Sequence, residues 1–270
     1  HDLFTQRALE MVDKSGPDPF FMHLAYTIPH ANNEMGRALG NGMEVPEDAP
    51  YSSRPWPQVE KNFAAMVTRM DRDMGRLFEA LKRKGIDDNT LVVFTSDNGP
   101  HREGGHDPDY FDSNGPVKGI KRDLYEGGIR VPAIARWPGK VPQARKSDFP
   151  WAFWDVMPTF AELAGTAAPA GLDGQSIVPA LTGRQQRPHE FLYWEFHEAG
   201  SKQAVRHGDW KAVRNRLKAP LELYDLSKDV GETENVAGAN PGVVARIEKY
   251  LETARTEHAE YPMAEAPAKR

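Results

Sequence analysis

The sequence predicts an α/β fold: a mixed, largely parallel sheet flanked by helices, followed by a small antiparallel sheet with a helix. Two short apolar runs, at residues 20–26 and 91–95, enclose a long segment whose apolar residues repeat at helical spacing, as in parallel α/β sheets. Four short strand-like stretches between residues 191 and 226, separated by tight turns, predict the antiparallel sheet. A Gly- and Pro-rich stretch precedes them, so we predict two domains, 1–186 and 187–270.

The first helix is predicted over residues 2–15. Asp2 can act as its N-cap, and Gly16 ends it because glycine readily adopts the backbone conformation of a helix C-terminus. The run 20–26 that follows is mostly apolar and is bounded by prolines, which suits a buried strand. The buried face of the helix is predicted to hold Phe4, Ala8, Leu9 and Val12.

The clearest helix is predicted over about residues 57–84. Basic residues fill its last turn, where they favour the negative end of the helix dipole, and Gly85 ends it. The run 91–95 then reads as a second buried strand. Ligand sites in parallel α/β sheets lie beyond the carboxyl ends of the strands. His30 and Asp97, which each follow a predicted strand, are therefore candidates for one site.

The second half of the chain contains shorter elements. Residues 129–137 are predicted to form a third strand, and the paired Gly127 and Gly128 before it predict close backbone packing. Asp155 can cap a helix that runs through Leu163. The stretches of the antiparallel sheet are 191–196, 203–207, 210–214 and 221–226, and the last helix begins near Asn240.

The composition restricts the classes of function. Hydrophobic residues make up 39% and charged residues 27% of the 270, which predicts a packed core. The formal charge of −5 argues against binding to nucleic acid or to a membrane surface through bulk charge. No apolar run approaches the about 20 residues that span a bilayer. The absence of cysteine excludes disulfides, thiolate catalysis and cysteine-ligated zinc.

Four groups of residues could carry chemistry. Asp97 and Asn98 offer oxygen ligands that suit Ca²⁺ or Mg²⁺, although an Asp-Asn-Gly sequence after a strand is also an ordinary turn. Lys121 could hold an anionic ester oxygen, or could be a solvated surface lysine. His30 could be a general acid, or only a polar loop residue. His101 and His106 could likewise contact a substrate or only decorate their loop.

These residues lie in segments that resemble a known family. The run Thr95 to Pro100 (TSDNGP) and the run Lys121 to Pro132 (KRDLYEGGIRVP) are similar to segments of the type I, formylglycine-dependent sulfatases, the arylsulfatase family of the alkaline-phosphatase-like superfamily. The resemblance covers nearly the whole chain and corresponds to the C-terminal portion of that fold. Further similar segments are 20–30, 155–159, 171–176, 208–211 and 222–226.

The resemblance implies a role for each candidate. Asp97 and Asn98 would be two ligands of one divalent cation, Ca²⁺ or alternatively Mg²⁺. Lys121 would bind the sulfate and the bridging ester oxygen, and His30 would contact the sulfate and protonate the departing alcohol. The domains would then be the C-terminal part of the catalytic α/β domain and a small C-terminal α+β subdomain. A periplasmic or secreted location is also implied.

One part of the family pattern is absent. Family members carry an upstream Cys-x-Pro-x-Arg motif, or its serine variant, whose first residue becomes the formylglycine nucleophile; this chain contains no such motif. The chain also opens in what reads as a helix, so we expect it to start within a longer protein, to be inactive alone and to bind metal poorly. We expect it to pair with its own N-terminal segment or to form a homo-oligomer.

The resemblance implies a sulfated small molecule or glycan as substrate. His101, His106 and the aromatic Tyr110 and Phe111 could line a sugar-binding rim, because aromatic faces and polar groups together suit carbohydrate. Two alternatives stay open. A phosphatase or phosphodiesterase of the same superfamily would favour paired metals with histidine ligands, or a Ser or Thr nucleophile. A non-catalytic sulfatase-like binding module would lack the upstream nucleophile motif.

Overall fold

The computed structural model describes residues 1–265, which group into two compact units. Unit 1 comprises residues 1–92, 101–113 and 136–139. Unit 2 comprises residues 93–100, 114–135 and the chain from residue 140 onward. These units are defined by packing, and the predicted domain boundary before residue 187 stays a prediction. Among the described residues, no helix combines the length and apolarity needed to span a membrane.

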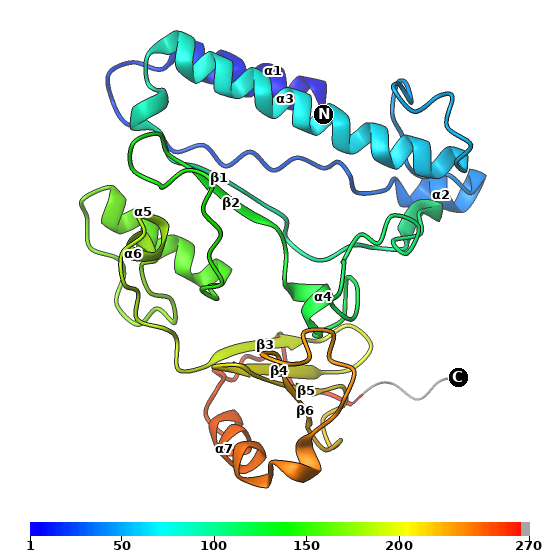
Figure 1. Cartoon of the computed structure of the whole chain (residues 1–270), viewed down its shortest axis with the longest axis vertical. Coiled ribbons are helices and arrows are strands. Elements are labelled where there is room, and N and C mark those ends of the chain that lie inside the picture. Colours follow the sequence, from blue (N-terminus) through cyan, green and yellow to red (C-terminus); the bar gives the residue numbers. More distant parts are fainter. Residues whose placement is uncertain (266–270) are drawn as a thin grey trace. The chain divides into compact units, whose positions relative to one another are not determined.

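Two helices that run in the same direction dominate unit 1: Asp2 pairs with Arg69 near one end, and Asp13 pairs with Arg83 near the other. Helix α1 (Asp2–Lys14) packs along α3 (Gln58–Lys84), and both predicted helices are confirmed (Figure 1). Gly85 ends α3 in the left-handed conformation, with φ of 75°, as the sequence predicted. The start of α1 differs, because His1 occupies the N-cap position while Asp2 lies in the first turn and pairs with Arg69. The apolar core between the helices contains Val12, Ala80 and Leu81, packed against Leu9, Phe20 and Met22.

Two sequence predictions for unit 1 are corrected. Phe4 was expected in the buried face of α1, but its side chain is 47% exposed. Residues 20–26 are extended and alternate between partly buried and exposed, the period of a strand, yet no described residue pairs with them in a ladder. Strand identity depends on a partner that sequence periodicity does not supply. The remaining elements of unit 1 are α2 (Asn33–Leu39), η1 (Asp87–Asn89) and η2 (Glu103–Gly105).

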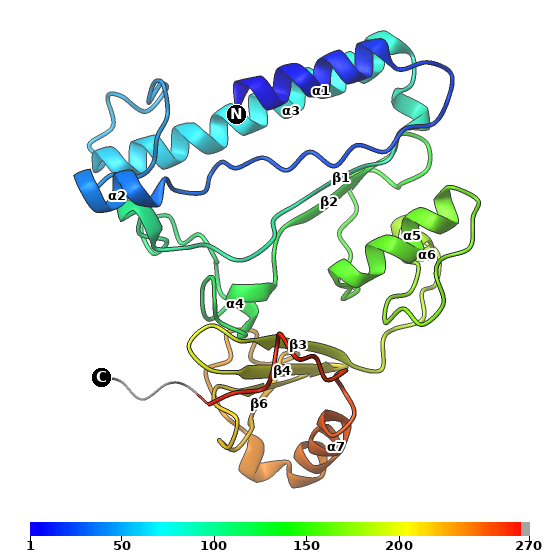
Figure 2. The same ribbon diagram turned by 180° about the vertical axis from the view of Figure 1, so that it is seen from behind.

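Strands β1 (Val92–Thr95) and β2 (Ala133–Arg136) form a two-stranded sheet and lie side by side in both views (Figures 1 and 2). The predicted strand at 129–137 starts later than expected, because the short helix α4 (Glu126–Ile129) occupies its first residue. In unit 2, η3 (Phe153–Asp155) leads into α5 (Val156–Leu163), followed by α6 (Val178–Leu181). Asp155 does not cap α5 with its side chain; its carboxylate accepts from the backbone of Ala152 and Gln175 instead.

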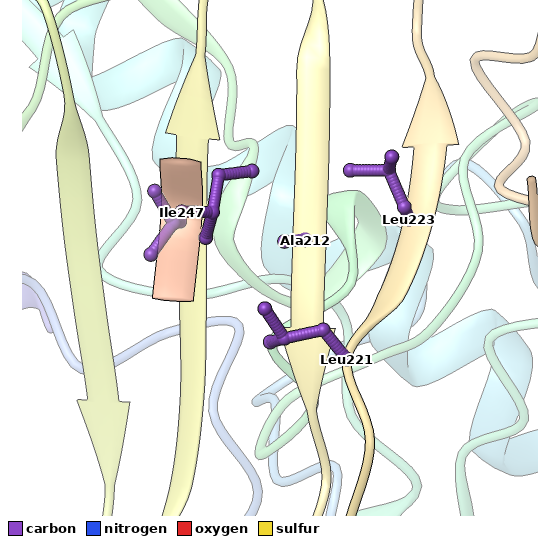
Figure 3. Packing of buried hydrophobic residues seen from close by; sticks show 5 residues of the cluster. Ala212, Leu221, Leu223 and Ile247 are labelled. Carbon is purple, nitrogen blue, oxygen red and sulfur yellow. The ribbon is translucent and has the colours of Figure 1, made fainter. Parts of the chain in front are cut away.

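The antiparallel sheet of unit 2 is confirmed. Its strands are β3 (Leu192–Phe196), β4 (Lys202–His207), β5 (Trp210–Arg214) and β6 (Glu222–Asp225), paired in that order. Helix α7 (Pro241–Leu251), preceded by η4 (Ala237–Ala239), covers one face of this sheet. Ile247 of α7 is fully buried against the sheet, and this apolar burial stabilises the unit. The core cluster also contains Val205, Ala212, Leu221 and Leu223 (Figure 3).

Candidate active site

Unit 2 brings the predicted metal ligands and Lys121 together through its backbone. Asp97 and Asn98 follow β1 after Ser96, and the next residue, Gly99, donates its N–H to the carbonyl oxygen of Gly128 at 3.0 Å. Lys121 donates its own N–H to the carbonyl oxygen of Pro100 at 2.8 Å. We call residues 97–100 with the loop 118–130 the Gly99 corner. Main-chain hydrogen bonds join its two segments.

Glycine makes this corner possible. A Cβ atom at Gly99 would lie 1.8 Å from the carbonyl oxygen of Gly127, so no other residue fits. A Cβ at Gly127 would lie 2.1 Å from the oxygen of Gly119, and one at Gly128 would lie 2.1 Å from the oxygen of Asp123. The predicted close packing of the paired glycines is therefore confirmed. The sequence did not reveal that Gly127 and Gly128 pack against the backbone of Gly99.

The side chains at the corner supply oxygen ligands. The Asn98 amide donates Nδ2–H to the carbonyl oxygen of Gly99 at 2.8 Å, which leaves its Oδ1 as the ligand atom. Asp97 is exposed next to it. A carboxylate and an amide oxygen fit a hard divalent cation. They make only part of a site, since no cluster of three or more His, Cys, Asp or Glu suited to a metal occurs among residues 1–265.

Unit 1 contains the three histidines that the sequence singled out, His30, His101 and His106. The imidazole of His30 donates Nδ1–H to the carbonyl oxygen of Ala31 at 2.7 Å, and its Nε2 lies 3.2 Å from Oε2 of Glu103. Both contacts are with oxygen atoms that can accept a hydrogen bond from the ring. The side chain of His30 is 47% exposed. A protonated, accessible imidazole is the form that can give a proton to a leaving group.

The two other candidate histidines, His101 and His106, are buried: His101 lies next to His30, and His106 lies next to His101. The ring of His101 lies 5.5 Å from that of His30, and its Nδ1 accepts the N–H of Glu103. Burial lowers the pKa of His101, which favours the neutral ring. His106 is stacked on Phe63 with ring centroids 3.8 Å apart. We call His30, His101 and His106 the imidazole cluster.

The ring of His106 is hydrogen-bonded to a buried carboxylate that the sequence analysis did not identify. Glu60, in the first turn of α3, is buried and accepts from Nδ1 of His106 at 2.7 Å and from the N–H of Asp107 at 2.9 Å. The side chain of His106 is 1% exposed, so this arrangement favours a supporting role for it. The predicted substrate contacts of His101 and His106 stay predictions. The available signal for Glu60 was an acidic residue within an otherwise apolar helix face.

Each unit therefore assembles part of the predicted site: Asp97, Asn98 and Lys121 in unit 2, and the imidazole cluster in unit 1. Glu103, the carboxylate next to His30, was not foreseen from the sequence. It lies two residues after His101, but nothing in that spacing indicates a contact with a residue more than seventy positions earlier.

The family comparison decides the classification. The family model described as Sulfatase matches residues 1–166, and the model for the C-terminal region of N-sulphoglucosamine sulphohydrolase matches residues 119–257. The chain belongs to the sulfatase family. Its mixed α/β fold is that family's fold. This sulfatase chain is similar to solved structures titled as crystal structures of Ps i-CgsB, with a TM-score of 0.81 and 32% identity over 94% of this chain and 54% of the other.

Curated relatives place the chain among sulfatases of several kinds. It is 29% identical to the uncharacterized sulfatase YdeN of Escherichia coli over 92% of this chain and 49% of that protein. It is 31% identical to the dog N-acetylgalactosamine-6-sulfatase over 87% of this chain and 42% of that protein. It is 32% identical to the human steryl-sulfatase over 72% of this chain and 32% of that protein. The sulfatase chain thus spans half or less of these relatives.

Proposed function

We propose that this chain forms part of an enzyme that hydrolyses a sulfate ester. The observation that carries the proposal is the Gly99 corner, where main-chain hydrogen bonds hold Asp97, Asn98 and the loop of Lys121 together in a chain of the sulfatase family. The Lys121 ammonium binds the sulfate and the bridging ester oxygen, where it offsets the negative charge that develops as the ester bond breaks. His30 contacts the sulfate and gives its Nε2 proton to the departing alcohol.

Asp97 and Asn98 would supply two of the oxygen ligands of one divalent cation, Ca²⁺ or alternatively Mg²⁺. When bound, such an ion supplies positive charge beside the anionic sulfate. The formylglycine of this family derives from cysteine or serine in a motif that this chain does not contain. We therefore infer that the chain is inactive alone and works with its own N-terminal segment, supplied in the same polypeptide or by association, or as a homo-oligomer. By family resemblance we also propose a periplasmic or secreted location.

The substrate we propose is a sulfated sugar. Two similar solved structures are titled as complexes, one with k-i-k-neocarrahexaose and one with D-glucosamine-2-N,6-O-disulfate. Unit 1 offers aromatic surface suited to a sugar ring: Tyr110 is 42% exposed and makes edge contacts with Phe111 and Trp56. Arg54 lies 5.7 Å from the Trp56 ring and adds a positive charge at this rim. The aromatic group contacts Phe63, which stacks on His106 of the imidazole cluster.

The test compares 4-nitrophenyl sulfate with 4-nitrophenyl phosphate in the complete protein that carries this chain, and in the 270-residue chain alone. We expect sulfate turnover to exceed phosphate turnover in the complete protein, and no turnover by the chain alone. Faster phosphate turnover would assign the enzyme to the phosphatase branch of the superfamily. Absence of both activities in a folded complete protein would favour a binding module. Turnover by the chain alone near the rate of the complete protein would contradict the division of labour proposed here.

A further inference from the structure

A buried cluster of charges lies within unit 2, outside the proposed contacts with the substrate. Lys211 of β5 is fully buried and places its Nζ 2.8 Å from Oε1 of Glu126 and 3.5 Å from Oε1 of Glu232. Glu126 and Glu232 are buried as well. Removing three ionised groups from water is unfavourable unless they compensate one another. We call Glu126, Lys211 and Glu232 the buried triad.

The charges in the triad are unequal. Burial raises the pKa of Glu126, but Lys211, Arg206 and Arg130 together outweigh burial, so this pKa is lowered. Burial raises the pKa of Glu232, and Lys211 offsets that effect only in part. Two guanidinium groups also face Glu126, since Arg206 and Arg130 lie 3.6 Å and 3.7 Å from its Oε2. Glu126 and Lys211 therefore form the dominant ion pair.

This cluster is joined directly to the Gly99 corner. Oε2 of Glu232 accepts the N–H of Glu126 at 2.6 Å, and the carbonyl oxygen of Glu232 accepts from Nζ of Lys118 at 3.3 Å. The N–H of Gly127 donates to the carbonyl oxygen of Lys118 at 2.6 Å. Both ends of the loop 118–130 are thus fastened to residues of the C-terminal part of unit 2. The Gly99 contact at Gly128 lies two residues beyond Glu126 in the same loop.

We propose that Lys211 is a positioning residue: through Glu126 it holds the loop 118–130 so that the Gly128 carbonyl accepts from the N–H of Gly99 and the N–H of Lys121 donates to the Pro100 carbonyl. The antiparallel sheet then serves as the support of the proposed sulfate-binding corner. The catalytic consequence rests on the proposed function. The positioning itself does not, because it concerns hydrogen bonds that can be followed without any substrate.

An ordinary stabilising ion pair would give a different result. Loss of such a pair would weaken all of unit 2 alike, whereas loss of a positioning contact opens the corner before the sheet. Leu223→Ala is the matched control, because Leu223 is fully buried in the core between the sheet and α7 and belongs to a different cluster. It weakens the unit without touching the triad.

The experiment measures amide hydrogen exchange in the complete protein and in three variants: Lys211→Met, Glu126→Gln and Leu223→Ala. In Lys211→Met we expect the amides of Gly99 and Lys121 to exchange at least about tenfold faster, while the amides of the β4–β5 ladder keep their protection. In Leu223→Ala we expect the ladder amides to accelerate at least as much as those of the corner.

Glu126→Gln keeps the shape of the side chain and leaves Lys211 paired with Glu232. We therefore expect this variant to fold, and it tests the proposal even if Lys211→Met does not fold. We expect the same selective acceleration at Gly99 and Lys121. Unchanged exchange at these two amides in Glu126→Gln, or equal acceleration throughout unit 2, would overturn the proposal. If the complete protein hydrolyses sulfate esters, kcat should fall about 10²-fold in Glu126→Gln, as for a displaced catalytic group. If it does not, the exchange result still decides the positioning role.

Discussion

The Gly99 corner and the imidazole cluster hold their functional groups in different ways. In the corner, Gly99, Pro100, Lys121 and Gly128 are joined by main-chain hydrogen bonds, and glycines are required because any Cβ would collide with a carbonyl oxygen. In the imidazole cluster, side chains hold one another: His30 lies against Glu103, and His106 lies between Glu60 and Phe63.

This difference predicts opposite sensitivities. The corner does not tolerate the addition of a single carbon atom at its glycines. The imidazole cluster does not tolerate the loss of one buried polar partner. The predictions that follow test this contrast, from the largest expected effect to the smallest.

Gly99→Ala is expected to have the largest effect. Its Cβ would lie 1.8 Å from the oxygen of Gly127, so the loop 118–130 must move and take Lys121 with it. We expect a loss of about 3 kcal/mol of unfolding free energy and about 10²-fold lower kcat/KM for a sulfate ester. Gly75→Ala in α3 is the control, because a Cβ there meets nothing within 4 Å. It should stabilise the protein by about 1 kcal/mol. Equal effects of both variants in urea unfolding would break the contrast.

Glu60→Ala tests the imidazole cluster. It leaves Nδ1 of His106 and the N–H of Asp107 without their buried acceptor, which should cost about 2–3 kcal/mol. Glu79→Ala is the control, since Glu79 lies on the same helix, is exposed and pairs with the exposed Lys82. We expect its unfolding midpoint to match that of the wild type. A Glu60 variant as stable as the wild type would show that the cluster does not depend on its side chains.

Asp73 gives the smallest effect, confined to acid. Burial opposes its charge, but hydrogen bonds from Arg72, Arg76 and Thr5 outweigh burial and lower its pKa below the usual 3.8. A carboxyl with a lowered folded-state pKa stabilises the fold above its unfolded pKa, and this contribution is lost as the pH falls through the folded value. In urea titrations between about pH 5 and pH 2, Asp73→Asn should therefore lose less stability than the wild type. If the stability of both proteins fell equally with pH, the lowered pKa of Asp73 would be contradicted.

The sequence predicted the elements whose signals are local. Helix α3 and the hairpin of β4 and β5 follow from helical and alternating periodicity, from Gly85 at a helix end and from Gly208 in a tight turn. Residues 20–26 were predicted to be a strand because they are apolar, but a strand also needs a neighbour, which periodicity does not identify. Helix α4 was not predicted, because its single turn contains two glycines, which have a low helix propensity.

The candidate site shows the same limit. Family resemblance identified Asp97, Asn98 and Lys121 within two runs of sequence, and the backbone then showed how they meet. The roles of the acids Glu60 and Glu103 arise from contacts with residues distant in sequence, which their positions along the chain do not indicate. The buried Lys211 was part of a recognised Gly-Asp-Trp-Lys segment, but only its burial between two glutamates indicates what it does.

The most direct test of the central claim measures kcat/KM of the Lys121→Ala variant of the complete protein on two substrates, with Lys140→Ala, an exposed lysine, as control. Lys121 is proposed to offset the negative charge that develops on the bridging oxygen, and this stabilisation contributes most to the rate when the leaving group is poor. The account predicts about a 10³-fold loss for a sulfated sugar, a smaller loss for 4-nitrophenyl sulfate, and none for Lys140→Ala. Equal losses on both substrates, or no loss on either, would contradict it.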